Sequence, residues 1–239
     1  MNIDVIPTLK ELTPQKIYGK TAIVLDIFRC TSTIITALAN GCREVIPART
    51  SLEAKDLVSR YPSNSVVLAG ETKGAKIPGF DLGNSPVEIA GYPILDKTLI
   101  LSTTNGTEAI RSCKPAKYVL IGSFLNVSST CTRAASNQKD TVIVCAGSEG
   151  NIALEDIMAA GCFVAHFKKC SQELRISDLS KTFYYLYKYF KNNLEQILLT
   201  SRSGQNLQVL GYSQDIFHCL KKDLYKIAPI YRNNAVHMA

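Results

Sequence analysis

Residues 26–33 combine side chains that could carry out phosphate chemistry. A carboxylate, Asp26, ends an apolar run, and Arg29 and two hydroxyl residues, Ser32 and Thr33, follow it at the start of a helical pattern. The carboxylate suits a metal ion, and the planar guanidinium of Arg29 matches phosphate or sulfonate oxygens. We expect Ser32 and Thr33 to bind a ligand. The alternative is a structural Asp–Arg pair with Ser32 or Thr33 capping the helix.

A long irregular stretch, residues 70–86, is the second candidate. Such a segment is uncommon in a compact domain unless it forms a lid or a binding loop. Glu71 and Asp81 are candidate Mg²⁺ ligands, and Lys73 and Lys76 are candidate partners for phosphate. It is not a phosphate-binding P-loop, because the spacing differs and neither Ser nor Thr follows the lysine. The alternative is a solvated loop.

A cluster of neutral donors follows the apolar run 98–101. Its glycine lets the backbone approach a ligand closely, and free N–H groups at the start of a helix favour an anion. We therefore predict that this loop binds phosphate, with an ordinary strand-to-helix turn and an N-cap as the alternative. The predicted binding residues are Ser102, Thr103, Thr104, Asn105, Gly106 and Thr107.

Another carboxylate, Glu149, lies in the loop 146–151 after an apolar run. Glu155 and Asp156 follow at the start of a helical pattern, where the alternative role is to complement the helix dipole. Oxygen ligands without a histidine cluster favour Mg²⁺ over zinc. With Arg and Lys, Mg²⁺ would offset the charge that develops in phosphoryl transfer. The residues thus indicate a Mg²⁺-dependent enzyme acting on a small phosphorylated anion.

The apolar runs that precede these loops are continuous rather than alternating, which is typical of strands buried on both faces. Helical patterns between them predict an α/β fold, in three layers around a parallel or mixed sheet. The runs from Ile23 and Ile143 each lead through a loop and a helix to Gly-Cys, at Gly41-Cys42 and Gly161-Cys162. A weak internal duplication is one interpretation, and chance similarity is the other. The predicted strands are 21–25, 65–69, 99–101, 118–121 and 141–146, and the predicted helices are 32–40, 52–60, 125–136 and 154–169.

The 239 residues suit one folding unit, with sub-halves at about 1–120 and 121–239 as a subdivision. The charge of +7 is dispersed, so we expect no nucleic-acid partner. We expect no membrane partner, because no apolar run approaches about 20 residues. Eight scattered cysteines without a C-x-x-C pair indicate a reducing cytoplasm.

Aromatic and aliphatic residues recur at helical spacing after about residue 177. This stripe predicts either core packing or a subunit contact, and a homodimer is plausible. The segment 203–206 then interrupts the helical pattern.

Several long motifs in the same order resemble the 2-phosphosulfolactate phosphatase family over nearly the whole chain. They are residues 26–33, 70–86, 102–107, 122–126, 145–150 and 154–156, with a tail of Gly204, Leu207, Asp215, Cys219, Asp223 and Pro229. The resemblance implies Mg²⁺-dependent hydrolysis of (2R)-2-phospho-3-sulfolactate to 3-sulfolactate and phosphate, a step of coenzyme M biosynthesis, on an α/β/α architecture. Cys30 stands where the family more often has alanine, which argues against a catalytic cysteine. Members also occur in organisms without coenzyme M, so another 2-phospho carboxylate is the alternative substrate.

We assign Asp26, Arg29 and Lys73 as catalytic. Asp26 and Glu149 would hold Mg²⁺, assisted by Glu71 or Asp81. Arg29, Lys73 and residues 102–107 would bind the phosphate, and Lys76 would bind the sulfonate. Asp26 is either a nucleophile or a metal ligand that orients water, and the sequence leaves both roles open.

Other reaction classes fit the residues less well. Cys30 lacks the arginine that cysteine phosphatases require, and Phe28 stands where a haloacid-dehalogenase-type phosphatase would have a second aspartate. A phosphotransferase would need a nucleotide site, which the sequence does not indicate. The alternative outside enzymes is an anion-binding module, which needs the same loops but no metal and no turnover.

Overall fold

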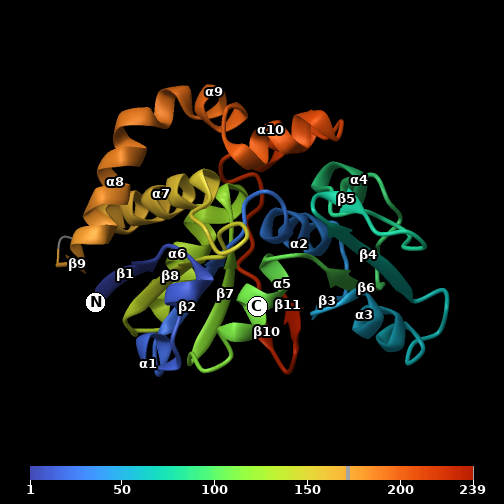
Figure 1. The fold of residues 1–239 in the computed structure, drawn as a ribbon. Helices are drawn as coiled ribbons and strands as arrows, with labels where there is room; N and C mark the ends of the chain where they lie inside the picture. Colours follow the sequence, from blue (N-terminus) through green and yellow to red (C-terminus); the bar gives the residue numbers. More distant parts are fainter. Residues whose placement is uncertain (171–172, 239) are drawn as a thin grey trace.

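One eleven-stranded sheet runs through the computed structural model, which describes residues 1–170 and 173–238 (Figure 1). The strand order is β5-β4-β6-β3-β11-β10-β7-β2-β8-β1-β9. The strands are β1 (Asn2–Ile6), β2 (Thr21–Leu25), β3 (Glu44–Ala48), β4 (Val66–Thr72), β5 (Ala75–Lys76), β6 (Thr98–Ser102), β7 (Tyr118–Gly122), β8 (Thr141–Cys145), β9 (Arg175–Ile176), β10 (Ile230–Arg232) and β11 (Ala235–His237).

Two groups of parallel strands make up most of this sheet. In one group β6 lies between β3 and β4, and in the other β2 lies between β7 and β8, with β1 beyond β8. The antiparallel hairpin β10–β11 joins the groups, through the pairs Ile230↔Leu120 and Val236↔Val45. Strands from the first and second halves of the chain are therefore hydrogen-bonded to each other, because all of β2 pairs with both β7 and β8.

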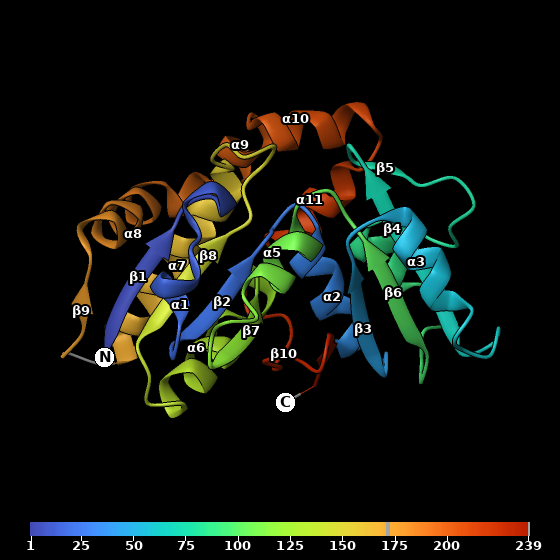
Figure 2. The ribbon, with the colours of Figure 1, turned by 60° about the horizontal axis from the view of Figure 1, so that its bottom comes forward.

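Helices cover both faces of the sheet (Figures 1 and 2). The α-helices are α1 (Pro14–Ile17), α2 (Cys30–Ala39), α3 (Ser51–Val58), α4 (Pro86–Ala90), α5 (Gly106–Ser112), α6 (Val127–Ser136), α7 (Leu154–Cys170), α8 (Asp178–Phe190), α9 (Leu194–Leu199), α10 (Arg202–Val209) and α11 (Ser213–Cys219). Short 3-10 helices are η1 (Leu9–Glu11), η2 (Phe124–Asn126) and η3 (Lys191–Asn193). None of the helices in the described ranges is both long and apolar enough to span a lipid bilayer.

The core is built from strand residues that alternate between the two faces. In β2 every residue is buried, with Ala22 and Val24 packing on the side of α2 and α5, and Ile23 and Leu25 on the side of α6 and α7. Burial on both faces explains why the apolar runs are continuous. The predicted three-layer α/β fold with a mixed sheet is confirmed.

Two local predictions differ from the structure. Gly41 follows α2 with a φ of +85°, whereas Gly161 lies inside α7, so the two Gly-Cys pairs occupy different positions relative to their helices. A β carbon at Gly161 would collide with the carbonyl group of Phe183, which shows how closely α7 and α8 pack. The interruption expected at 203–206 is instead part of α10, because Gly204 packs against a carbonyl group of α9 and Ser201 caps the helix.

Candidate active site

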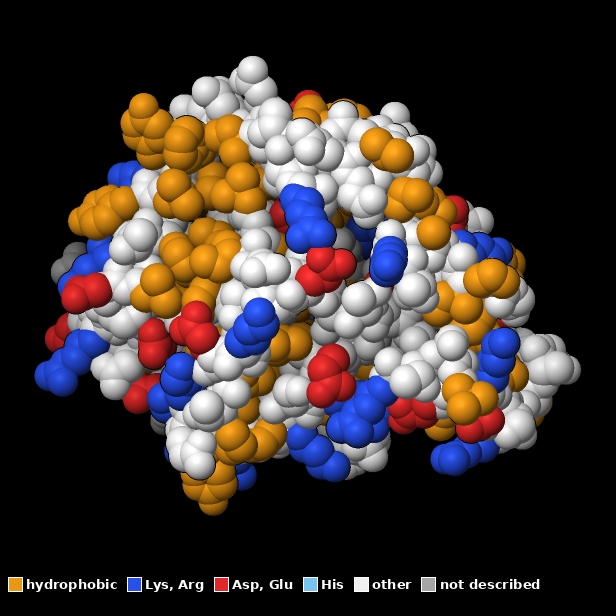
Figure 3. All heavy atoms as spheres, viewed as in Figure 1, with side chains coloured by type: hydrophobic (Ala, Val, Ile, Leu, Met, Phe, Trp, Pro, Cys, Tyr) orange, Lys and Arg blue, Asp and Glu red, His pale blue; other side chains and the backbone are white. Residues whose placement is uncertain are grey.

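The segments that follow β2, β4, β6 and β8 line one cavity of about 480 Å³. Helix α10 forms its remaining wall and extends from the loop after β8 to the turn between β4 and β5 (Figure 2). Charged side chains of both signs gather below α10 near the middle of the face in Figure 3. The lining includes Asp26, Phe28, Arg29, Glu71, Lys73, Gly74, Asn84, Thr104, Asn105, Ser148, Glu149, Arg202, Ser203, Gln205 and Asn206.

Asp26 is a buried acid in the lining of this cavity. It directly follows β2, where the Thr31 hydroxyl accepts a hydrogen bond from the Asp26 N–H at 3.1 Å and donates one to its carbonyl oxygen at 2.9 Å. The Cys30 N–H donates to the Asp26 carboxylate at 3.3 Å. Burial and then the negative charge of Glu71 raise the pKa of Asp26 to about 7. This carboxyl group is therefore close to its protonation midpoint at neutral pH.

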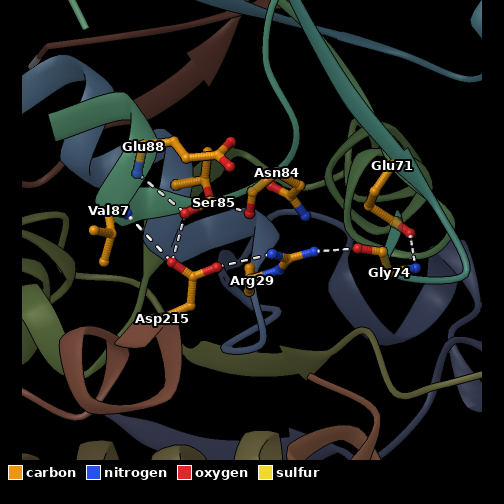
Figure 4. A network of polar contacts seen from close by, with 9 residues as sticks. Arg29, Glu71, Gly74, Asn84, Ser85, Val87, Glu88 and Asp215 are labelled. Atoms are coloured by element: carbon orange, nitrogen blue, oxygen red, sulfur yellow. Dashed lines mark hydrogen bonds and ion pairs between the residues drawn. The ribbon is translucent and has the colours of Figure 1, made fainter. Parts of the chain in front are cut away.

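Arg29 also lines the cavity and is held by several contacts (Figure 4). Its guanidinium donates to the Asp215 carboxylate at 2.8 Å and to the carbonyl oxygen of Gly74 at 2.6 Å, and it lies 4.3 Å from the centre of the Tyr212 ring. Arg29 and Asp215 are each only 2% exposed. The predicted ion pair exists, but its acid is Asp215 rather than Asp26.

Asp215 also connects this arginine to the start of α4. Its second carboxylate oxygen accepts hydrogen bonds from the Ser85 hydroxyl at 2.5 Å and the Val87 N–H at 3.4 Å (Figure 4). Asp215 lies on α11, far along the chain from Arg29, so spacing in the sequence gives no sign of the contact. The only signal was its place in the family motif of the tail.

Glu71 organises the loop after β6. Its carboxylate accepts from the Thr104 N–H at 2.7 Å, from the Thr104 hydroxyl at 3.2 Å and from the Gly74 N–H at 2.6 Å. The Thr104 N–H that we expected to be free for phosphate is thus used within the protein. Of the predicted binding residues 102–107, only Thr104 and Asn105 line the cavity.

The other residues of this loop do not line the cavity and instead stabilise the conformation of the loop. The Thr103 hydroxyl accepts from the Thr107 N–H at 3.1 Å, and the Thr107 hydroxyl donates back to the Thr103 carbonyl oxygen at 3.1 Å. Ser102 is buried at the end of β6. Gly106 packs so closely on Asp26 and Cys30 that any β carbon would collide with them. The glycine is needed for close packing of this loop on the acid.

Glu149 contacts a residue that the sequence analysis did not select. Its carboxylate accepts a hydrogen bond from the Arg202 guanidinium at 2.6 Å, and its N–H donates to the Asn105 side chain at 3.4 Å. At the other end of α10, the Asn206 side chain donates to the Lys73 carbonyl oxygen at 3.4 Å. Helix α10 therefore contacts opposite walls of the cavity.

Four further predicted site residues, besides those of the loop after β6, lie outside the cavity lining. The hydroxyl groups of Ser32 and Thr33 are buried, and each donates to a main-chain carbonyl group at 3.0 Å. The Lys76 ammonium donates to the carbonyl oxygen of Asp81 at 2.7 Å. The Asp81 carboxylate accepts a hydrogen bond from a main-chain N–H at 2.8 Å. These polar groups stabilise the loops, and the structure does not bring them beside Asp26.

Two further acids lie at the start of α7. Asp156 accepts from the N–H groups of Ile27 at 2.9 Å and Gly147 at 3.0 Å, which ties the loop after β2 to the loop after β8. Glu155 is buried, burial raises its pKa, and its Oε2 atom has no hydrogen-bond partner. The sequence placed both acids correctly at the start of this helix, with a helix-dipole role as the alternative, but it did not predict these buried contacts.

Oxygen donors in the cavity suit a hard cation. In residues 1–170 and 173–238, no three His, Cys, Asp or Glu side chains are grouped as a ready-made metal site. Mg²⁺, however, is usually held by one or two carboxylates together with water and substrate phosphate. Asp26 and Glu71 both line the cavity, and burial followed by the negative charge of Glu71 raises the pKa of Asp26.

Comparisons with known proteins agree on one family. The family model described as 2-phosphosulpholactate phosphatase matches residues 7–234. The chain is 39% identical over 236 residues to the "Probable 2-phosphosulfolactate phosphatase" of Caldanaerobacter subterraneus subsp. tengcongensis, with 99% of this chain and 98% of that protein covered. Proteins of the same printed name from Clostridium beijerinckii and Clostridium acetobutylicum are 35% and 36% identical, with 99% of this chain covered and 99% and 100% of theirs.

Proposed function

Because the chain belongs to the 2-phosphosulfolactate phosphatase family, a family of phosphatases, we propose that it hydrolyses (2R)-2-phospho-3-sulfolactate. The net reaction consumes one water molecule, and the products are 3-sulfolactate and inorganic phosphate. The observation that carries this proposal is the buried Asp26, with its pKa near 7, in one cavity with Arg29, Lys73 and Arg202. That combination suits the transfer of a phosphoryl group from a substrate with several negative charges.

Asp26 and Glu71 would hold Mg²⁺. When bound, the ion would polarise the phosphoryl oxygens and offset the charge that develops on them. Of the other predicted ligands, Glu149 is paired with Arg202 and Asp81 lies outside the cavity lining. Two carboxylates with water and substrate phosphate satisfy the preference of Mg²⁺. The buried, unpartnered Oε2 atom of Glu155 adds to the negative potential at Asp26 and supports a cation there.

Side chains of the protein itself bind and orient the phosphoryl group. Arg29 uses two N–H groups on Asp215 and Gly74, and its guanidinium has others that can point to a phosphoryl oxygen. Because these contacts fix its position in advance, its charge acts without reorganisation during the reaction. Lys73, in the turn after β4, adds a second positive charge to the cavity. Asp26 either attacks phosphorus or orients the attacking water.

The decisive assay measures phosphate release from phosphosulfolactate and from p-nitrophenyl phosphate, with Mg²⁺ and with EDTA. We expect release from phosphosulfolactate only with Mg²⁺, and a loss of at least about a hundredfold in kcat for Asp26→Asn. Asp56→Asn, an exposed aspartate on α3, is the matched control. Turnover by Asp26→Asn at the wild-type rate would show that Asp26 has no catalytic role.

The same assay separates the alternatives. Release from other 2-phospho carboxylates alone would keep the phosphatase and reject the named substrate. No release in any condition would favour an anion-binding module. Release that persists in EDTA would reject the Mg²⁺ requirement.

The cellular context and the assembly also belong to this proposal. Turnover of phosphosulfolactate would place the protein in coenzyme M biosynthesis, and its eight free cysteines suit the cytoplasm. We propose a homodimer on the exposed face of α8, where Leu179, Tyr185 and Tyr189 leave apolar surface uncovered. Hydrophobic side chains gather over this helix in Figure 3.

A further inference from the structure

The proposed substrate carries three acid groups on neighbouring carbons, and only one of them reacts. The phosphate leaves, while the carboxylate and the sulfonate remain on the product. A specific enzyme must recognise these two groups, because other phosphate esters lack one or both of them. Lys76, which the sequence suggested for the sulfonate, lies outside the cavity lining and donates to a main-chain carbonyl group.

Arg202 is the cation in the cavity that is best placed for this task. Within the described part of the chain, the cationic side chains of the lining are Arg29, Lys73 and Arg202. Arg29 lies beside Asp26 and is held by Asp215. Arg202 comes from the opposite wall, on α10, and is 72% exposed. It is therefore accessible to a ligand that enters the cavity.

The present partner of Arg202 indicates which chemistry it accepts. The Glu149 carboxylate binds the guanidinium at 2.6 Å, and Glu149 is itself 53% exposed. An ion pair that is this exposed contributes little free energy, so another oxyanion can replace it at low cost. Carboxylate and sulfonate oxygens match the planar guanidinium in the same way.

We propose that Arg202 is a specificity-determining residue that binds one of the two acid groups left on the product, taking it in place of Glu149. This inference rests on the function proposed above. It assigns α10 the recognition of the non-reacting end of the substrate, opposite the Asp26 and Arg29 wall where the phosphoryl group reacts.

The test compares Arg202→Gln with wild type on three substrates. These are phosphosulfolactate, 2-phosphoglycerate, which lacks the sulfonate, and the phosphate ester of 2-hydroxypropane-1-sulfonate, which lacks the carboxylate. On phosphosulfolactate we expect kcat/KM to fall by about tenfold to a hundredfold, mainly through KM, as for the loss of a charge-assisted hydrogen bond. The loss should disappear on the analogue that lacks the group bound by Arg202, which identifies that group.

Two variants control for indirect effects. Arg60→Gln removes an exposed arginine outside the cavity and should leave all three rates unchanged. Arg202→Lys keeps the charge without the planar fork and should recover part of the loss. An equal loss on all three substrates would overturn the inference, because Arg202 would then act on the phosphate or on the fold.

A binding measurement separates this inference from the proposed function. Isothermal titration with 3-sulfolactate needs no turnover, since this molecule carries both acid groups but no phosphate. We expect Arg202→Gln to bind it at least about tenfold more weakly than wild type. If wild type releases no phosphate from phosphosulfolactate but binds 3-sulfolactate more tightly than Arg202→Gln does, the proposed reaction is rejected and the role of Arg202 is retained. Equal binding by the two proteins would reject that role.

Discussion

Two arginines that line the same cavity each pair with a carboxylate, and the two pairs differ sharply in their surroundings. Arg29 and Asp215 are 2.8 Å apart, and each side chain is 2% exposed. Arg202 and Glu149 are 2.6 Å apart, but they are 72% and 53% exposed. The distances are similar, so burial is what separates the two pairs.

Burial determines which of the two ion pairs has a fixed geometry. A buried pair is tolerated only when further hydrogen bonds satisfy both charges, and Gly74, Ser85 and Val87 supply them here. Removing one partner would leave the other charge buried and uncompensated. The exposed pair has water as an alternative partner for both groups, and its net contribution is small. Arg29 is therefore fixed, whereas Arg202 can exchange its partner.

Asp215→Asn should have the largest effect, because it removes the acid of the buried pair. The substitution keeps the shape of the side chain but leaves the buried Arg29 charge without its counter-ion. We expect the free energy of unfolding to fall by about 3–5 kcal/mol, measured by urea denaturation at pH 7.

The matched control is Asp178→Asn, which breaks the exposed Asp178–Lys181 pair, and it should leave the free energy of unfolding nearly unchanged. Similar effects for the two variants would mean that burial does not distinguish these ion pairs.

Much of the fold was predictable from local sequence. Continuous apolar runs correctly indicated β2, β4, β6, β7 and β8, because strands buried on both faces need no polar alternation. The hairpin β10–β11 was not predicted. It joins the two groups of strands through few pairs, and its short segments show no periodic pattern.

The cavity lining was predictable where residues lie at or soon after the end of a strand, as for Asp26, Glu71 and Glu149. It was not predictable where contacts cross the whole chain. Arg202 lines the cavity and Asp215 holds Arg29; both come from helices near the C-terminus, and nothing in the local sequence specifies their partners. Likewise, hydroxyl-rich spacing could not show that Ser32 and Thr33 would satisfy main-chain carbonyl groups instead of a ligand.

Asp26 extends the comparison to a buried acid without an ion-pair partner of its own. Its pKa is about 7 in the folded protein, against an ordinary value of 3.8. Between these values the folded protein binds more protons at Asp26 than the unfolded chain does. The free energy of unfolding should therefore fall as pH rises from about 4 to about 7, by up to about 1.4 kcal/mol per pH unit.

Urea denaturation in EDTA across this pH range tests the effect of Asp26. Asp26→Asn removes the titrating group, so its stability should depend less steeply on pH and exceed that of wild type above about pH 7. Added Mg²⁺ should stabilise wild type at high pH more than it stabilises the variant. Parallel pH profiles for the two proteins would show that Asp26 does not titrate in this window.

Glu149→Gln should have the smallest effect and separates two roles for this residue. If Glu149 only occupies Arg202, the variant loses an exposed ion pair, and its stability should change by less than about 0.5 kcal/mol. Because the competing carboxylate is gone, KM for phosphosulfolactate should stay the same or fall, with kcat and the Mg²⁺ concentration for half-maximal rate unchanged. Glu108→Gln, which breaks the exposed Arg49–Glu108 pair outside the cavity, is the control. A higher Mg²⁺ requirement in Glu149→Gln alone would restore Glu149 as a metal ligand, and the exposed pair would then belong to the catalytic framework as well.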